Sequence, residues 1–169
     1  LRFLMAPSGV DKGWVTAPDL IAVDAQGQVR QGEGRASAET PLHLAIIEAT
    51  GAASVLHTHS VFGTLLSTVY AGQGAIAIAG YEMLKGLEGI TTHTATVQIP
   101  VLPNSQDMAQ VSQSVSALLE EPELRPHGIL LAGHGLYTWG DTLFQARRHV
   151  EILEFLFEVI YRKLTLPSL

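Results

Sequence analysis

The sequence of 169 residues contains no cysteine. The chain can therefore form neither a disulfide framework nor a thiolate metal site, and its composition agrees with a reducing compartment. It also lacks any apolar run of the roughly 18 residues that a membrane-spanning helix needs. No signal-peptide pattern is present, so we expect a cytoplasmic protein with no membrane partner.

Charged side chains are scarce: 15% of the residues are Asp, Glu, Lys or Arg, against 47% hydrophobic residues. The formal net charge is −6, and Lys and Arg are scattered rather than gathered in a basic stripe. We therefore expect no nucleic-acid partner. The apolar surplus over an ordinary soluble monomer indicates a subunit interface, or a core that a partner extends.

The spacing of apolar residues predicts short strands interspersed with helices. Expected strands cover 1–6, 20–24, 29–30, 55–59, 74–80, 95–100, 128–132 and 136–139. Expected helices cover 37–51, 60–71, 81–87, 107–119 and a long segment after 141. Ser37 and Asp141 are the expected N-caps, and Phe144 is expected on the apolar stripe of the last helix. Because no strict βαβ rhythm is present, we expect an α/β fold with helices on both faces of a mixed sheet.

The length is suited to one domain over residues 1–169, with a sizeable core. No internal repeat, low-complexity segment or linker divides it. Because Leu1 already stands within an apolar strand-like run, we expect that an N-terminal segment of the domain precedes it.

Two histidines one residue apart end the apolar run Val55-Leu56-His57-Thr58-His59-Ser60. Alternate side chains of a strand share a face, so His57 and His59 point the same way, with Cα atoms roughly 6.6 Å apart. Such a pair also arises by chance on a polar strand face. His134, between two glycines at an expected strand end, would be a third imidazole, and three ligands leave catalytic Zn²⁺ an open position.

The remaining histidines are weaker candidates for metal ligands. His43, His127 and His149 are most simply surface or core-edge residues, and His93 in a Thr-rich loop is ambiguous. An ordinary turn histidine is also the simpler interpretation of His134 when it is taken alone.

A proton-transferring group is also needed, because a metal ion alone only polarises a substrate. Glu82 stands at an expected strand-to-helix junction between glycines, and Glu39 lies near an expected helix N-terminus. Either could simply be a helix-dipole partner or a solvated charge. We rank Glu82 above Glu39 as proton carrier, because it follows an apolar strand at a glycine turn.

Ser8, Gly9 and Ser37 offer hydroxyl and backbone N–H donors of the kind that bind phosphate. Ordinary turn and capping roles explain the same residues without a ligand. The sequence contains no Gly-x-Ser-x-Gly, no His-Glu-x-x-His and no Walker loop, so the serine hydrolase, zincin and nucleotidase classes lack support.

Taken in order, these motifs resemble the class II aldolase family of zinc-dependent sugar-phosphate enzymes. The matching stretches are 6–12, 37–43, 55–60, 80–86 and 134–140, and the helix at 146–158 is similar as well. The histidine motifs are typical of the whole family. Pro-Ser-Gly-Val-Asp-Lys and Glu-Met-Leu-Lys-Gly resemble its dehydratase branch, which acts on a methylthio-substituted ketose phosphate in methionine salvage.

The resemblance implies a class II aldolase-like domain with a largely antiparallel central sheet, assembled as a homotetramer with sites near subunit contacts. It implies that His57, His59 and His134 hold one Zn²⁺ per subunit. It also implies that Glu82 is the acid/base residue. Glu39 matches the position of the aldolases' own catalytic glutamate and is a second candidate acid or base.

The resemblance also implies a sugar-phosphate substrate, contacted through its phosphate by Ser8, Gly9 and Ser37. The family has a further phosphate loop upstream of the matching region, and we expect it ahead of Leu1.

We therefore expect a zinc-dependent lyase that dehydrates a ketose phosphate. Retro-aldol cleavage or epimerisation of a sugar phosphate on the same metal site stays open, because no residue pattern separates these reactions. A non-catalytic interaction domain is the alternative from another class. The three histidines and Glu82 argue against it, since a scaffold has no use for an open metal site.

Overall fold

The computed structural model describes residues 2–121 and 123–166. A five-stranded sheet of order β4-β8-β7-β6-β5 forms its centre. Neighbouring strands are antiparallel except β6 and β7, which are parallel. The strands are β4 (Ser54–Thr58), β5 (Ala75–Ile78), β6 (Val97–Leu102), β7 (Gly128–Leu131) and β8 (Gly135–Gly140). The expected mixed, largely antiparallel central sheet is confirmed.

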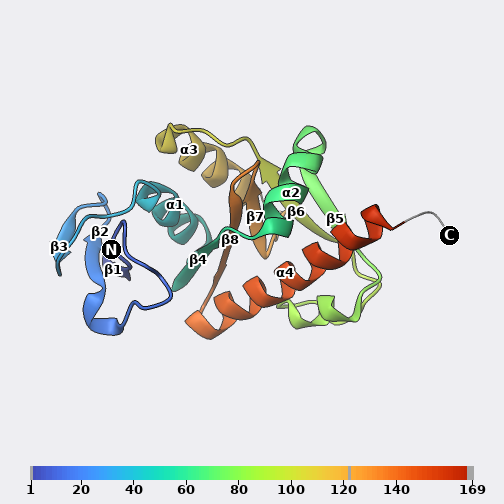
Figure 1. Cartoon of the computed structure of the whole chain (residues 1–169), viewed down its shortest axis with the longest axis horizontal. Coiled ribbons are helices and arrows are strands. Elements are labelled where there is room, and N and C mark those ends of the chain that lie inside the picture. The colour runs from blue at the N-terminus through green and yellow to red at the C-terminus, as the bar shows by residue number, and fades with distance from the viewer. Residues whose placement is uncertain (1, 122, 167–169) are drawn as a thin grey trace.

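A separate three-stranded antiparallel sheet of order β1-β2-β3 lies at one end of the molecule, on the left of Figure 1. Its strands are β1 (Arg2–Met5), β2 (Ile21–Asp24) and β3 (Val29–Gln31). The long connection from β1 to β2 carries Ser8 and Gly9, together with the short 3₁₀ helix η1 (Ala17–Asp19).

Helices cover both faces of the five-stranded sheet, as expected (Figure 1). Neighbouring residues of a strand point to opposite faces, so each central strand serves two cores. Leu130 and Leu136 pack toward α2 and α4, whereas Ile129, Leu131 and Tyr137 pack toward α1 and α3. The helices are α1 (Thr40–Thr50), α2 (Val61–Tyr70), α3 (Met108–Leu119) and α4 (Leu143–Thr165), with the short 3₁₀ helices η2 (Ala71–Gln73) and η3 (Glu82–Gly86).

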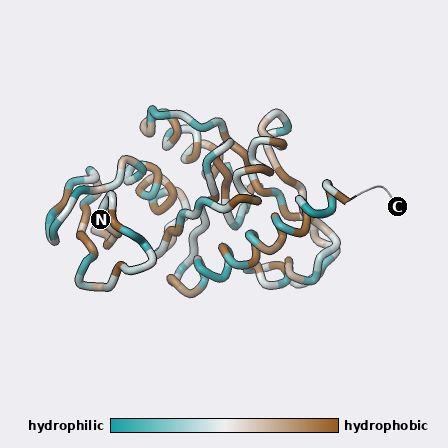
Figure 2. The backbone as a smooth tube through the Cα atoms, in the orientation of Figure 1, coloured by the Kyte–Doolittle hydropathy of each residue, from teal (hydrophilic) through white to brown (hydrophobic). Residues whose placement is uncertain are grey.

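The long helix α4 is amphipathic, and its tube alternates between brown and teal in Figure 2. Leu153 and Phe157 are buried as expected, but Phe144 is 75% exposed. The assignment of Phe144 to the buried stripe is wrong. Phe144 lies nine positions before Leu153, which is about two and a half helical turns, so the two side chains are on opposite sides of the helix. Within the described residues, no helix is both long and apolar enough to cross a membrane.

Both expected N-caps are wrong: Ser37 by two positions and Asp141 by one. Helix α1 begins at Thr40 with Glu39 at the N-cap, because Pro41 favours the first turn, and Ser37 lies in the turn before the helix. Helix α4 is capped by Thr142, whose Oγ1 accepts the N–H of Gln145 at 3.1 Å.

His149 is only 4% exposed, so the expectation of a surface or core-edge position is wrong. It lies on the face of α4 that packs against β8, where its Nδ1–H donates to the Trp139 carbonyl at 2.9 Å. His127 donates through Nε2–H to the Glu88 carbonyl at 2.7 Å. Burial is the main cause that lowers the pKa of both imidazoles, which favours their neutral forms.

Lowering the pH from about 7.5 to about 5.5 should therefore reduce the free energy of unfolding of the metal-free protein. A histidine whose pKa is lowered by folding binds more protons in the unfolded chain, so stability falls as the pH drops below about 6.5. The variant His127→Gln/His149→Asn keeps an N–H donor at each site without a titrating ring, and should lose less stability. Urea unfolding at the two pH values checks this. An equal loss in wild type and variant would contradict it.

Candidate metal centre

Four side chains from separate parts of the chain meet at one end of the five-stranded sheet. Glu39, His57, His59 and His134 each offer one ligand atom, and these four atoms lie within 4.8 Å of one another. His57 belongs to β4, His59 follows that strand directly, and His134 lies in the turn between β7 and β8. The structure thus brings together the three histidines singled out from the sequence, and it adds Glu39 from the N-cap of α1.

The ring of His57 is oriented by the neighbouring strand. Its Nδ1 lies 2.9 Å from the Leu136 carbonyl, which can only accept, so Nδ1 carries the proton and Nε2 has a free lone pair. That Nε2 points to His59, whose own Nε2 is 2.7 Å away. Burial lowers the pKa of His57 to about 4, so the imidazole is neutral near pH 7, the form that binds metals.

The turn that carries His134 is anchored by α2. Gly133 adopts a φ of 65°, a left-handed conformation that suits glycine, and its N–H donates to Ser67 Oγ at 3.0 Å. The hydroxyl of Thr64 donates to the His134 carbonyl at 3.0 Å. These contacts hold the backbone on both sides of the His134 ring.

Only glycine fits at the start of β8. A Cβ on Gly135 would overlap the Thr58 carbonyl oxygen and would lie 3.0 Å from His59 Cδ2 and 3.1 Å from His57 Cε1. The absence of a side chain at this position therefore lets the two histidines of β4 approach the turn that carries His134.

Glu39 turns its carboxylate toward the histidines. Its Oε1 lies 3.1 Å from His134 Nε2 and 3.6 Å from His57 Nε2. The other ring nitrogen of His134, Nδ1, is buried and has no hydrogen-bond partner among residues 2–121 and 123–166. Three imidazoles and one carboxylate make a donor set that suits Zn²⁺ and also Fe²⁺, Co²⁺ or Mn²⁺. The residues present therefore fit a bound divalent metal.

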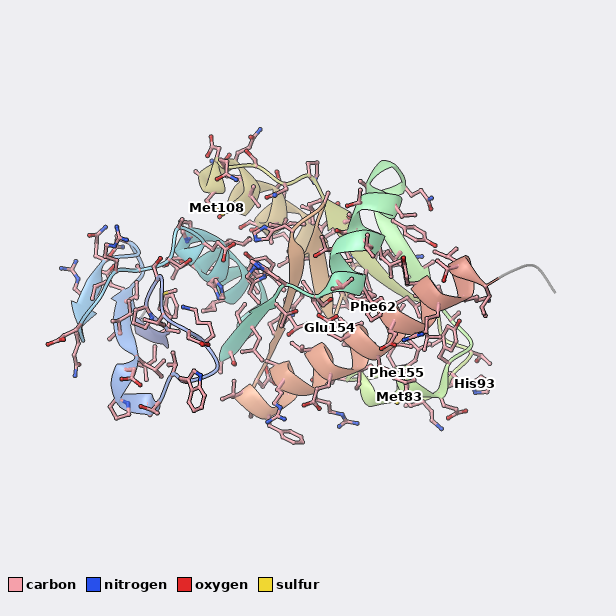
Figure 3. All side chains as sticks on the ribbon, viewed as in Figure 1. Phe62, Met83, His93, Met108, Glu154 and Phe155 are labelled. Carbon is pink, nitrogen blue, oxygen red and sulfur yellow. The ribbon has the colours of Figure 1, made fainter. Side chains whose placement is uncertain are left out.

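Glu82, the expected proton carrier, does not belong to this cluster within a single protomer. It opens η3, which follows β5 after residues 79–81. Strands β5 and β4 are opposite edges of the sheet, roughly 19 Å apart at four spacings of about 4.8 Å. The side chain of Glu82 is 67% exposed, and its carboxylate pairs with Lys85 at 2.5 Å and His93 at 3.1 Å. Figure 3 labels His93 at the side of the molecule away from β4. The hydrogen bond from Lys85 is the main cause that lowers the Glu82 pKa.

The expected phosphate-binding residues lie on two segments that pair with each other. The backbone N–H of Ser8 donates to the Arg35 carbonyl at 2.8 Å, which ties the Ser8-Gly9 turn to the chain entering α1. Ser37 lies in that entering segment, and its Oγ accepts the N–H of Glu39 at 3.2 Å. Ser8, Gly9 and Ser37 are therefore connected to the metal centre through Glu39, although Ser8 has its own N–H already engaged.

Sequence reasoning missed Tyr137. This residue pairs directly with His57 across β8 and β4, and the two rings stack with centroids 4.0 Å apart and planes 15° apart. The pairing of two strands far apart in the sequence would have been needed to find it, and the apolar pattern alone does not supply that register.

A cavity of about 740 Å³ lies away from the metal centre. Trp139, His127 and His149 line it together with residues at the C-terminal end of α3, and none of the candidate site residues reaches it. The histidine and glutamate cluster and this cavity are thus separate features, and we place function at the cluster because its donor groups converge.

The family model of the class II aldolase and adducin N-terminal domain matches residues 1–161. The chain belongs to this family. It is 44% identical over 162 residues to a methylthioribulose-1-phosphate dehydratase of Xanthomonas campestris pv. campestris strain 8004, covering 95% of this chain and 74% of that protein. It is 45% identical over 150 residues to a methylthioribulose-1-phosphate dehydratase of Xylella fastidiosa strain 9a5c, covering 88% and 68%.

Solved structures of class II aldolase proteins share the fold. An L-fuculose 1-phosphate aldolase superposes with a TM-score of 0.75 at 18% identity, over 99% of this chain and 74% of that one. The YgbL protein of Klebsiella pneumoniae, described as a putative aldolase/epimerase/decarboxylase, gives 0.78 at 25% identity over 95% and 73%. The class II aldolase-like fold is therefore confirmed.

Replacing Gly135 by Ala should reduce the affinity for Zn²⁺ at least about tenfold, because the added Cβ displaces His57 and His59. Gly72→Ala is the matched control, since nothing lies within 4 Å of a Cβ there. Competition with a chromophoric chelator measures both affinities, and circular dichroism checks folding. A folded Gly135→Ala variant with wild-type affinity would rule out this packing constraint.

Proposed function

We propose that this protein catalyses the dehydration of 5-methylthioribulose 1-phosphate to 5-methylthio-2,3-diketopentyl 1-phosphate, a cytoplasmic hydro-lyase step of methionine salvage. The observation that carries the proposal is the 44% identity, over 95% of the chain, to a relative named methylthioribulose-1-phosphate dehydratase. The Glu/His₃ cluster supports it, because a metal ion held there would supply the Lewis acidity that this dehydration needs.

We assign one Zn²⁺ per subunit to His57, His59 and His134. A divalent ion held there supplies Lewis acidity, which stabilises negative charge on the ketone oxygen of the substrate. The neutral, carbonyl-oriented imidazole of His57 supports this assignment, since neutral histidine is the usual zinc ligand. Glu39 faces the same point and is a second candidate acid or base.

Glu82 is the proposed acid/base residue. It would take the proton from C3 of the substrate and return a proton to the C4 hydroxyl, which leaves as water. The resulting enol tautomerises to the 2,3-diketone, so the overall change is the loss of one water molecule.

Glu82 can serve this role only if it acts on the metal centre of a neighbouring protomer, because it follows the opposite edge of its own sheet. Exposed apolar residues support such a contact at both places: Val61 and Leu65 follow the His-x-His motif at 70% and 40% exposure, and Met83 beside Glu82 is 40% exposed. We propose a homotetramer in which adjacent protomers complete each other's sites.

The substrate phosphate is assigned to Ser8, Gly9 and Ser37. These residues lie on paired segments next to Glu39, where hydroxyl and N–H donors can bind the anion. Contacts remote from the reacting carbons supply binding energy that can be used to orient them.

An aldolase is the second candidate function, favoured by the position of Glu39 within the cluster. Incubation of the full-length protein with methylthioribulose phosphate separates the two reactions. The dehydratase forms an absorbing diketone, whereas an aldolase splits off a dihydroxyacetone phosphate fragment. If the protein forms neither of these products and also holds no metal, a non-catalytic domain is favoured.

Replacing Glu82 by Gln should lower the rate of dehydration at least about 10²-fold, because the amide cannot carry the proton. Bound metal should stay unchanged, since Glu82 lies outside the cluster. Glu120→Gln, another exposed glutamate, is the control and should keep full activity. Near-normal turnover of the Glu82→Gln variant would move the acid/base role to Glu39.

Mixing two inactive variants tests whether Glu82 acts between protomers. Glu82→Gln keeps its histidines, whereas His57→Ala/His59→Ala keeps Glu82. After dissociation and reassembly of an equal mixture, half of the sites have intact histidines and half of those face an intact Glu82, so about a quarter of wild-type activity should return. No recovery in mixed oligomers of confirmed composition would contradict action between protomers.

A further inference from the structure

Tyr137 occupies the space behind the metal centre and is fully buried. Its ring lies parallel to that of His57, with centroids 4.0 Å apart and planes 15° apart. On another side the edge of His43 approaches, with centroids 5.6 Å apart and planes at 69°. The stacking leaves His57 little room to tilt, so the Tyr137 ring sets the plane in which His57 presents its Nε2.

The hydroxyl of Tyr137 is near enough to the carboxylate of Glu39 for the two groups to interact. An ordinary phenol is protonated near pH 7, so the Tyr137 hydroxyl is a donor, and burial and then the negative charge of Glu39 raise its pKa further. Within the described part of the chain, no acceptor meets full hydrogen-bond geometry with this buried hydroxyl. A buried donor without an acceptor is costly, and the adjacent group that can relieve the cost by a small side-chain movement is Glu39.

We propose that Tyr137 is a positioning residue of the metal centre. Its ring fixes the orientation of His57, and its hydroxyl donates to Glu39 and holds that carboxylate turned toward His57 and His134. Glu39 stands at the N-cap of α1, outside the regular helix, so its side chain needs an external contact to keep one orientation. One strand, β8, then orients both an imidazole and a carboxylate of the cluster.

An ordinary core role is the competing explanation, since Tyr137 also belongs to the apolar cluster between the sheet and helices α1 and α3. Trp139 lies two residues further along β8, in the same apolar cluster, and pairs across the strands with Val55 rather than with a histidine of the site. It therefore provides a matched control for a general loosening of this core.

The two explanations differ in how Tyr137 and Glu39 depend on each other. We expect Tyr137→Phe to lower the affinity of the metal-free full-length protein for Zn²⁺ about 10-fold or more, as loss of an orienting partner does. In a Glu39→Ala background the same change should lower the affinity less than about twofold, because the hydroxyl has nothing left to position. Chelator competition measures the affinities, and the visible absorption of the Co²⁺ form reports the ligand geometry.

Trp139→Phe should leave both the affinity and the Co²⁺ spectrum unchanged. The proposal fails if Tyr137→Phe binds Zn²⁺ like wild type, if its effect persists in the Glu39→Ala background, or if Trp139→Phe has the same effect. It also fails if Tyr137→Phe raises the thermal unfolding midpoint. Such a rise would mean that the buried hydroxyl is an unpaired donor that destabilises the fold and positions nothing. The proposal rests on the metal part of the proposed function, but these measurements use no substrate, so they are independent of the dehydratase assay.

Discussion

The antiparallel pairing of β4 with β8 is the constraint on which the candidate site depends. This register places His57 opposite Tyr137 and gives His57 Nδ1 the carbonyl of Leu136 as its acceptor. The same pairing requires glycine at position 135, directly before the strand residues that orient His57. A shift of one residue would turn His57 to the other face of the sheet and would dissolve the cluster.

The histidine cluster could be predicted from the sequence because its signals are local. Strand alternation orients His57 and His59, and a glycine-flanked histidine at a strand end marks a backbone that can approach a ligand. The position of Glu39 could not be predicted in the same way, since it depends on where α1 begins, and neighbouring residues compete for that N-cap. Tyr137 depends on the register between strands about 80 residues apart, which tertiary packing decides.

The fold was predictable at the level of layers and less so in detail. Continuous apolar runs such as Gly128–Leu131 indicate strands buried on both faces, and the helices on the two sides follow from that pattern. The burial of His149 was not predictable, because charged neighbours on α4 conceal a position that faces β8. Glu82 is the remaining case: its proposed role requires a second protomer, and the apolar surplus of the sequence indicates an interface without fixing its geometry.

The account depends most on a divalent metal being held by histidines from two distant parts of the chain. Elemental analysis of the purified full-length protein, beside a His134→Ala variant, tests this directly. We predict about one zinc or comparable ion per chain in the wild type and a large loss in the variant. A folded wild-type protein without transition metal, or a variant that keeps the full content, would contradict the central claim.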